Sequence, residues 1–502
     1  MTNNPAHIAH SGTDTADPRR WPALAILLLA SFMNLIDVTI VNVALPAMQA
    51  NLGATSSQIE WVSAAYVLAF ALFLLPFGRL GDIIGRKTMF LVGVAVFTLC
   101  SALCGIAPSM EFLIGARVLQ GIAGAIMTPQ VLAIVQVIFP MKERSSAFSF
   151  FGLTAGLASV AGPLAGGSLI AANFLQLDWR PIFLVNIPIG LVAVILGIMF
   201  IPATKPNAGL KNDFPGIVLF GIAMVALVFP LIEGRAYGWP LWAFGSMVLA
   251  VVVGVLFFLW EKRQERRGNT QLLPVALLRN RNFVVGTVMS TLFFSAIPGL
   301  FMVLALFFQA GFGLSALESG LTTLPFPIGV LVASFVSNRL GNRFLSWRVA
   351  IGSLVLAVGM TYLHVVLSGV GASVDHWQFV GPLLISGFGM GITVSGLFQT
   401  ILQGVPPRDA GSASGTLQAF QQAGGALGIA LVGQIFFATL ESGRDWGATS
   451  QAAAFVGAGV NASFYPIACF VLVAAMVPLL KRAPRQQAAP GEAPGHPVIV
   501  EV

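Results

Sequence analysis

The sequence predicts an all-helical protein that crosses a membrane many times. Hydrophobic residues fill 57% of its 502 positions and charged residues only 9%, whereas a soluble domain carries about 25% charged residues. Apolar stretches of about 20 residues, the length that spans a bilayer as a helix, recur from end to end. The alternating ten-residue strands typical of an outer-membrane barrel are missing from the pattern.

Fourteen apolar stretches can be counted, and we expect a membrane-spanning helix in each. The first keeps an acidic residue and has no small-residue cleavage site after it, so we expect a retained helix and not a signal peptide. Polar or Pro/Ala/Gly-rich composition predicts disordered cytoplasmic tails over 1–20 and 484–502. The expected spans are 21–45, 59–78, 88–106, 111–139, 145–171, 181–201, 214–232, 240–260, 283–307, 316–337, 347–368, 378–403, 410–439 and 461–480.

The basic residues predict how the chain is oriented. If the N-terminus is cytoplasmic, 22 of the 26 Lys and Arg residues fall in tails and loops on the inner side, and only Arg180, Arg235 and Arg444 fall outside. This bias follows the positive-inside rule. We therefore expect both termini in the cytoplasm and a multi-pass protein of the bacterial cytoplasmic (inner) membrane. The net charge of +7 is then explained by topology and anionic lipid, so we expect no nucleic-acid partner.

A short internal repeat predicts two related bundles. Arg79-Leu80-Gly81-Asp82 follows the second span, and Arg339-Leu340-Gly341-Asn342 follows the tenth. We expect a six-helix bundle over 21–202, a linker with two extra helices and a basic cytoplasmic loop over 203–278, and a second six-helix bundle over 279–483. Repeated bundles around a midplane site are typical of alternating-access transporters.

One acidic residue lies inside the first span. Asp37 is the only carboxylate between Trp21 and Pro46, and a lone acid in hydrocarbon by default marks a functional site. If Pro46 ends the helix, Asp37 lies ~13 Å below that end, and Arg117 lies ~9 Å below Glu111 in the fourth span. These depths allow a buried pair, in which Asp37 could exchange Arg117 for a proton or a cationic substrate. A permanent structural pair is the alternative.

A glycine-rich basic segment follows the second span. Gly78 and Gly85 permit a tight turn between two helices, and Asp82 can bind helix-end donors or nearby basic groups. The segment resembles the signature loop of the major facilitator superfamily, with Gly81 and Ile83 in place of the usual alanine and arginine. We expect it to latch the cytoplasmic side through Gly78, Asp82, Gly85, Arg86 and Lys87.

Two further motifs strengthen this resemblance. The stretch Arg117–Gly124 is similar to the fourth-helix motif of the superfamily. In the fifth span, small residues at four-residue spacing let helices approach closely, and a proline favours a kink. This arrangement resembles the antiporter motif, which in the superfamily accompanies export in exchange for protons. Its residues are Gly152, Gly156, Gly162, Pro163, Gly166 and Gly167.

The fourteen spans narrow the resemblance to one group. Together with Leu35–Pro46, Trp179–Gly190 and Gly411–Gly428, they look like the EmrB/QacA-type drug:proton antiporters, and the likeness covers about residues 21–482. That group often carries an arginine before a glutamine in the thirteenth span, where this chain has Gln421-Gln422.

Other polar residues in the spans could line a substrate cavity, or could simply tie helices together at about 0.6 kcal/mol each. Four glutamates near the outer helix ends are expected to be mostly solvated, where an acidic rim would favour the release of cations. The cavity candidates are Asn34, Asn42, Tyr66, Gln120, Gln399, Gln418 and Gln421, and the glutamates are Glu60, Glu111, Glu233 and Glu318.

The sequence as a whole predicts a proton-driven exporter of lipophilic, cationic compounds, with no enzymatic activity, cofactor or metal. The expected partners are small amphiphilic substrates, protons and the lipid bilayer, and the export route leaves room for a periplasmic adaptor and an outer-membrane channel. The three cysteines, Cys100, Cys104 and Cys469, lie in apolar runs and offer no zinc set. The alternatives are an exporter of an organic acid, fatty acid or siderophore, a non-transporting membrane sensor, and a membrane-embedded enzyme.

Overall fold

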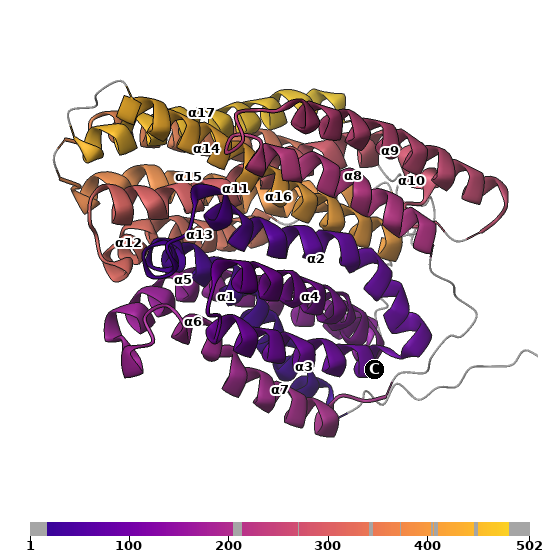
Figure 1. Ribbon diagram of the computed structural model, residues 1–502. Coiled ribbons are helices and arrows are strands. Elements are labelled where there is room, and N and C mark those ends of the chain that lie inside the picture. Colours follow the sequence, from indigo (N-terminus) through magenta and orange to yellow (C-terminus); the bar gives the residue numbers. More distant parts are fainter. Residues whose placement is uncertain are drawn as a thin grey trace, which may run out of the picture.

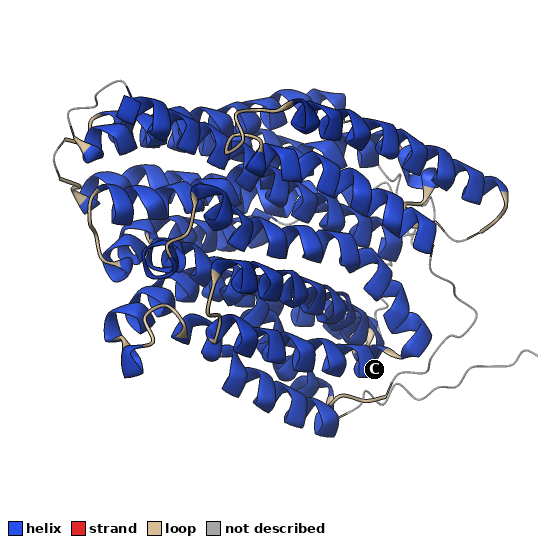
Figure 2. Ribbon diagram, in the orientation of Figure 1, coloured by secondary structure: helices blue, strands red, loops and turns tan. Residues whose placement is uncertain are grey.

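The computed structural model describes residues 18–203, 213–269, 271–340, 345–371, 373–402, 405, 410–445 and 450–480. Within these ranges every regular element is a helix (Figure 2). Fourteen helices in the described part of the chain are long and apolar enough to cross a membrane. The predicted fold class, an all-helical protein with fourteen spans, is therefore confirmed. Most of the expected N-terminal tail and all of the C-terminal one lie outside the described residues.

The N-terminal half forms one bundle, drawn in indigo to magenta in Figure 1. Within it α1 packs on α5, both α2 and α3 pack on α4, and α7 packs on α1 and α3. Its helices are α1 (Arg20–Leu52), α2 (Ser56–Ile84), α3 (Arg86–Gly105), α4 (Met110–Ile138), α5 (Met141–Ala172), the short η1 (Phe174–Gln176), α6 (Pro181–Leu184) and α7 (Asn186–Phe200).

The C-terminal half repeats this arrangement. Here α11 packs on α16, both α13 and α14 pack on α15, and α17 packs on α11 and α14, so corresponding helices pair in the two halves. Its helices are α11 (Arg281–Leu306) with the π-helical turn η2 (Phe307–Gly311), α12 (Ala316–Thr323), α13 (Pro325–Leu340), α14 (Leu345–Ser368), α15 (His376–Leu402), α16 (Ala410–Asp445), α17 (Gln451–Met476) and η4 (Val477–Leu479).

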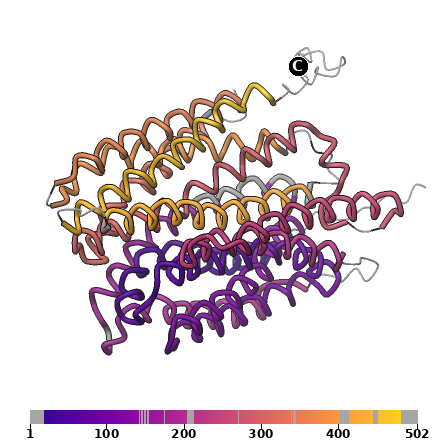
Figure 3. Tube along the Cα trace, turned by 45° about the horizontal axis from the view of Figure 1, so that its top comes forward, coloured from indigo at the N-terminus to yellow at the C-terminus, as the bar shows by residue number. Residues whose placement is uncertain are grey.

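The inserted pair of helices forms a hairpin beside both bundles. It consists of α8 (Phe214–Glu233) and α9 (Leu241–Arg266), followed by the short α10 (Val275–Leu278). Because α8 packs on α2 and on α16, the hairpin lies along the line where the two bundles meet (Figures 1 and 3). The outer side of α9 exposes a row of apolar side chains, which suits contact with lipid. These are Val248, Val251, Val255 and Leu259.

Prolines break two of the spans but not the first. Proline lacks the N–H that bonds four residues back, and the helix is interrupted at Val185, before Pro188, and at Leu324, before Pro325. The expectation that the first span ends at Pro46 is wrong, because α1 continues through it to Leu52. There Gly53 adopts φ 64°, a left-handed value that suits glycine at a helix end.

The two bundles meet along two main seams, and α1 also packs on α11 and α12. We call the face where α1 begins the basic face, and the face that carries Gly53 the opposite face. One seam joins α2 to α16, and the other joins α5 to α12 and α13. In the second seam, a Cβ atom built on Gly167 would lie 2.5 Å from Leu317 Cα, and one built on Gly320 would lie 2.7 Å from the Pro163 carbonyl oxygen. Glycine is therefore required on both helices for this approach.

Gly167→Ala is expected to force α5 and α12 apart near the opposite face. The added methyl group would meet backbone atoms, which cannot move aside as a flexible side chain can, and overpacking of this kind costs about 1–3 kcal/mol. We expect a lower melting temperature of the purified protein and slower transport. Gly254→Ala on α9 is the matched control, because nothing lies within 4 Å of its Cβ position. Equal behaviour of the two variants would contradict the close-packing argument.

Candidate functional site

Asp37 and Arg117 form a buried ion pair inside the N-terminal bundle. The Arg117 Nη1 atom lies 2.6 Å from Asp37 Oδ2. Asp37 is 0% exposed and Arg117 is 1% exposed. The structure thus brings together the two side chains that the sequence suggested as a pair. Enclosure matters here, because breaking a buried pair leaves an uncompensated charge in a medium of low polarity.

The other carboxylate oxygen of Asp37 is held by amide groups. Gln120 Nε2 donates to Asp37 Oδ1 at 2.9 Å, and Asn186 Nδ2 donates to the same oxygen at 3.3 Å. Both amides also donate to the Ser101 hydroxyl, at 2.8 and 3.3 Å respectively. Helices α1, α3, α4 and α7 therefore meet at one polar network, which we call the Asp37 network: Asp37, Ser101, Arg117, Gln120 and Asn186.

Arg117 has acceptors besides Asp37. Its Nε donates to the Val62 carbonyl oxygen at 3.1 Å, and its Nη1 donates to Gln120 Oε1 at 2.6 Å. The guanidinium carbon also lies 4.1 Å from the centre of the Tyr66 ring, a distance at which a cation is attracted to the ring face. The guanidinium would therefore keep partners if the carboxylate lost its charge.

The same helix α1 contacts both α5 and the other bundle just beyond Asp37. The Thr39 hydroxyl lies 3.5 Å from the Ala158 carbonyl oxygen of α5. Farther along, Gln309 Nε2 of η2 donates to the Val43 carbonyl oxygen at 2.8 Å. A movement of α1 caused by a change at Asp37 would therefore reach an inter-bundle contact within two helical turns.

Two members of the Asp37 network were not selected from the sequence. Asn186 lies within the stretch Trp179–Gly190, which was noted only for its likeness to a family motif, and Ser101 is a common small polar residue in an apolar helix. An amide inside the expected span 181–201, five residues before its middle, was the available signal for Asn186. Nothing in the sequence distinguishes Ser101 from serines that bond their own helix.

Three of the expected cavity residues, all in the N-terminal bundle, are buried and hydrogen-bonded between helices. Gln120 belongs to the Asp37 network. Asn34 Nδ2 donates to the Tyr66 hydroxyl at 2.8 Å, and Tyr66 is 1% exposed. The side chains of Gln120 and Tyr66 therefore lie against other helices, and their contact with a substrate stays a prediction.

The remaining candidates differ in exposure. Gln421 is buried, and its Nε2 donates to the Ser290 hydroxyl at 3.0 Å between α16 and α11. Asn42 and Gln418 are half-buried, and Gln399 is exposed. Their contact with a substrate stays a prediction.

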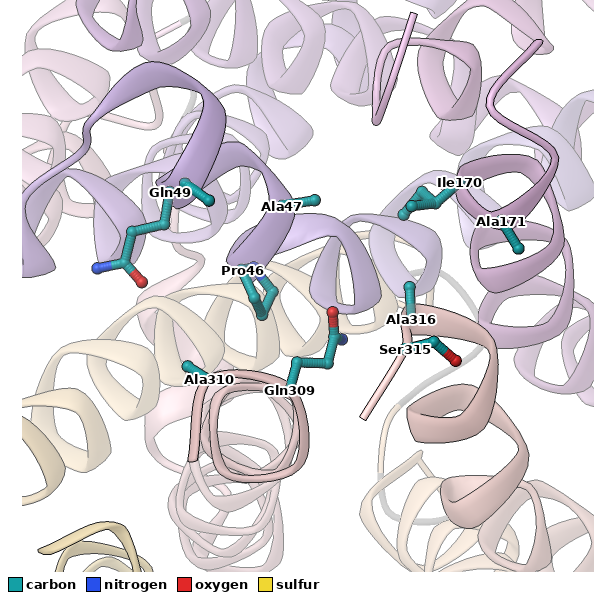
Figure 4. Close-up of a pocket in the computed structure, with 10 residues that line it drawn as sticks. Pro46, Ala47, Gln49, Ile170, Ala171, Gln309, Ala310, Ser315 and Ala316 are labelled. Atoms are coloured by element: carbon teal, nitrogen blue, oxygen red, sulfur yellow. The ribbon is translucent and has the colours of Figure 1, made fainter. Parts of the chain in front are cut away.

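A cavity of about 510 Å³ lies between the bundles at the opposite face. Figure 4 shows it between α1, α5, η2 and α12, with the Gln309 side chain directed toward α1. None of the seven expected cavity residues is among its lining, which is mostly apolar and consists of Pro46, Ala47, Gln49, Ala50, Ile170, Ala171, Gln309, Ala310, Ser315 and Ala316.

The signature loop is shorter than expected. Gly78 lies inside α2, so its expected place in the turn is wrong, and Gly85 alone separates α2 from α3, with φ 115°. Arg86 Nε donates to Asp82 Oδ1 at 2.8 Å and its Nη1 donates to the Ala133 carbonyl oxygen at 2.8 Å. Lys87 Nζ donates to the Ile198 carbonyl oxygen at 2.8 Å. These contacts tie the loop to α4 and α7 of its own bundle, and its latch role stays a prediction.

The residues of the antiporter motif lie along α5, which faces α1 on one side and the other bundle on another. Cβ atoms built on Gly162 and Gly166 would collide with Thr39 and Ile40 of α1, and one built on Gly156 would collide with Leu331 of α13. Gly152 and Pro163 also lie within α5. The motif therefore permits close packing of α5 against the part of α1 that directly follows Asp37.

The four outer glutamates are not all solvated. Glu318 forms a capping box with Ser315, and Glu111 accepts from Gln58 at 2.7 Å. Glu233 accepts from Trp61 Nε1 at 2.7 Å. Glu60 is only 1% exposed, so the expectation of solvation is wrong for this residue. Its position cannot be inferred from sequence, because it depends on packing against α16.

Comparisons with known proteins give the family. The Major Facilitator Superfamily profile matches residues 27–429. The chain is 39% identical to a "Probable actinorhodin transporter" of Streptomyces coelicolor, over 86% of this chain and 75% of that one. It is 33% identical to a "Tetracenomycin C resistance and export protein" of Streptomyces glaucescens, over 86% and 78%. It is 31% identical to the "Multidrug resistance protein Stp" of Mycobacterium tuberculosis, over 82% and 75%.

Solved structures agree on the fold. The POT family transporter PepTSo superposes with a TM-score of 0.66 at 16% identity, over 92% of this chain and 97% of that one. A bacterial homologue of the lysosomal transporter Spinster, in an inward-facing and unoccupied conformation, superposes with a TM-score of 0.64 at 16% identity, over 92% and 98%. Given the profile match, the relatives and the two repeated bundles, this chain belongs to the Major Facilitator Superfamily and is a membrane transporter and not an enzyme.

Proposed function

We propose that the protein exports lipophilic small molecules across the bacterial cytoplasmic membrane in exchange for protons, and that Asp37 carries the proton. Relatives that cover most of the chain are named for the transport of, or resistance to, antibiotics, which supports drug efflux. The basic face would be cytoplasmic, as the positive-inside rule predicts. The proton coupling rests on the Asp37 network.

The observation that carries the proposal is that this network offers partners for two charge states. With Asp37 ionised, its oxygens accept from Arg117, Gln120 and Asn186. With Asp37 protonated, Arg117 would keep the Val62 carbonyl oxygen, Gln120 Oε1 and the Tyr66 ring. A buried arginine with no other acceptor would make loss of the carboxylate charge far more costly.

Proton binding would loosen the hold of α4 on α1. Since α1 contacts α5 at Thr39 and accepts the Gln309 bond at Val43, its shift would alter the contacts between the bundles. Alternating exposure of a central site to the two sides by movement of one bundle against the other is the general scheme for such repeated folds. Asp37 would take up its proton from the opposite face and release it at the basic face.

Enclosure of Asp37 favours the proton over a cationic substrate as its ligand. The hydrogen bonds described to its two oxygens come from Arg117, Gln120 and Asn186, and the residue is 0% exposed. A proton needs no cavity, whereas a lipophilic cation does. We therefore propose lipophilicity as the common property of the substrates and keep their positive charge as a prediction from sequence.

The test uses purified protein in liposomes with a pH-sensitive dye inside. A fluorescent lipophilic cation such as ethidium and a neutral polycyclic antibiotic are added in turn to liposomes with an imposed proton gradient. We expect transport of at least one compound, dissipation of the gradient only when that compound is present, and loss of transport when an ionophore removes the gradient. Transport that continues without a gradient would refute proton coupling. Transport of organic acids, fatty acids or siderophores alone would refute drug export.

A further inference from the structure

A second buried acid lies where the two bundles and the hairpin meet at the opposite face. Glu60, in the first turns of α2, is 1% exposed, and neither carboxylate oxygen has a hydrogen-bond partner among the described residues. Its carboxylate lies against α16, because a Cβ atom built on Gly433 would be 2.5 Å from Glu60 Oε2. A side chain at Gly433 would exclude Glu60 from this position.

The cation beside Glu60 comes from the hairpin. Arg235, in the turn between α8 and α9, places Nη2 3.6 Å from Glu60 Oε1 and Nε 3.6 Å from Glu441 Oε1. Its guanidinium carbon lies 4.8 Å from the centre of the Phe437 ring. A single arginine thus bridges α2 of the N-terminal bundle to α16 of the C-terminal bundle. We call Glu60, Arg235 and Glu441 the outer triad.

The charges around Glu60 are unequal. The described charged groups that act on it are Arg235, Glu233 and Glu441, so one cation serves three carboxylates. Glu441 is 55% exposed at its side chain, whereas Arg235 is 8% exposed. Arg235 is therefore the only described group that offsets the buried Glu60 charge, and it does so only while α2, the hairpin turn and α16 stay together.

The outer triad differs from the Asp37 network in how well its members are bonded. Asp37 has an ion pair at 2.6 Å and accepts two amide bonds. In contrast, both Glu60 oxygens and Arg235 Nη1 are buried and have no hydrogen bond within the described part of the chain. Buried polar atoms left unbonded are uncommon and call for an explanation. Separation of the bundles at this face would admit water to them, which fits a contact that is made and broken in each cycle.

We propose that the outer triad is an ionic latch that holds the opposite face closed, with the inserted hairpin supplying its cation. This inference rests on the proposed function, since a latch matters only if the two bundles move apart at this face. It gives the two additional helices a role in transport: Arg235 positions the bundles and does not contact substrate. It also predicts that substitutions of different members shift the equilibrium between the closed and the open state in opposite directions.

Loss of Arg235 would leave Glu60 buried beside two other carboxylates, so Arg235→Ala would favour the state in which Glu60 reaches water. Glu60→Gln would remove the charge that needs burial, so the closed state would become more favourable. In the double variant both charges are absent, and the equilibrium should return close to that of the wild type. A purely structural ion pair would instead give two variants with the same loss of stability.

The test measures the distance between the bundles in the full-length protein. Spin labels are attached at Phe112→Cys on α4 and Trp377→Cys on α15, which are 41% and 82% exposed in the first turns of their helices, after the three natural cysteines have been replaced. Pulsed electron paramagnetic resonance then gives the populations of short and long distances. For Arg235→Ala we expect the long-distance population to rise about tenfold, within the range of coupling between linked sites, and for Glu60→Gln we expect it to fall.

Two further variants test whether a change in the distances reflects the latch and not misfolding of the protein. Glu441→Gln removes one of the three carboxylates that share Arg235, so it should shift the distances in the same direction as Glu60→Gln, and by less because the Glu441 side chain is 55% exposed. Arg180→Ala removes another arginine of this face, whose described side-chain contacts stay within the N-terminal bundle, and should leave the distances unchanged. If Arg235→Ala and Glu60→Gln shift the populations in the same direction, or neither shifts them, the latch is refuted. Distances that shift as expected in a protein that moves no drug would refute the proposed function and leave the latch standing.

Discussion

Asp37→Asn should reduce drug-driven proton movement in liposomes to the level of protein-free liposomes. Asparagine has almost the same shape and can still accept from Gln120 and Asn186, so the helices around the Asp37 network should stay packed. It cannot bind and release a proton, and Arg117 keeps the Val62 and Gln120 acceptors. We therefore expect loss of coupling, together with some loss of stability because Arg117 stays buried without an anionic partner. The measurement is the internal pH on addition of drug, together with the melting temperature.

Asp375→Asn provides the control for this substitution. Asp375 is exposed and its Oδ1 accepts from the Trp377 backbone N–H at the start of α15, a position where asparagine caps a helix about as well as aspartate. Transport by this variant should match the wild type. Coupled proton flux that survives in Asp37→Asn would exclude Asp37 as the carrier and support the permanent structural pair.

Arg117→Ala should be the most destabilising single substitution of the site. It would leave Asp37 buried with no cation, and removing one partner of a buried pair typically costs about 3–5 kcal/mol. The lost contact with the Tyr66 ring adds to this cost. We expect a lower melting temperature in detergent, a smaller yield of monodisperse protein and no transport.

A double variant separates charge from packing. Arg117→Ala combined with Asp37→Asn no longer buries a lone carboxylate, so it should be more stable than Arg117→Ala alone while remaining inactive. Arg279→Ala is the surface control, because its ion pair with Glu265 at 3.0 Å involves a side chain that is 73% exposed, and such pairs contribute about 0–1 kcal/mol. A double variant less stable than Arg117→Ala would contradict the role assigned to the unpaired charge.

The sequence predicted the helices and the central pair well because both depend on local composition. Fourteen apolar runs and one acid in the first of them are visible without a structure, and Arg117 is equally conspicuous in its own run. The ends of the helices were harder to predict from the sequence. Pro46 was taken as an end, but a transmembrane helix tolerates proline because neighbouring groups satisfy the freed carbonyl.

The polar partners could not be predicted in the same way. Ser101 and Asn186 join the Asp37 network only because α3 and α7 pack beside α1, and that packing is a property of the bundle. Glu60 shows most clearly which features the sequence could not predict. Its place near a helix end suggested contact with water, whereas the absence of a side chain at Gly433, far along the chain, determines that it is buried.

The position of the hairpin makes the two main seams between the bundles unequally accessible to compounds dissolved in the bilayer. Helix α8 lies against α2 and α16, so a lipophilic molecule diffusing laterally toward that seam meets the hairpin first. The seam between α5 and α13 lies on a different flank of the N-terminal bundle, where Gly156 lets Leu331 approach. The hairpin therefore shields one seam between the bundles from compounds dissolved in the bilayer, and the α5 flank depends on its own close packing.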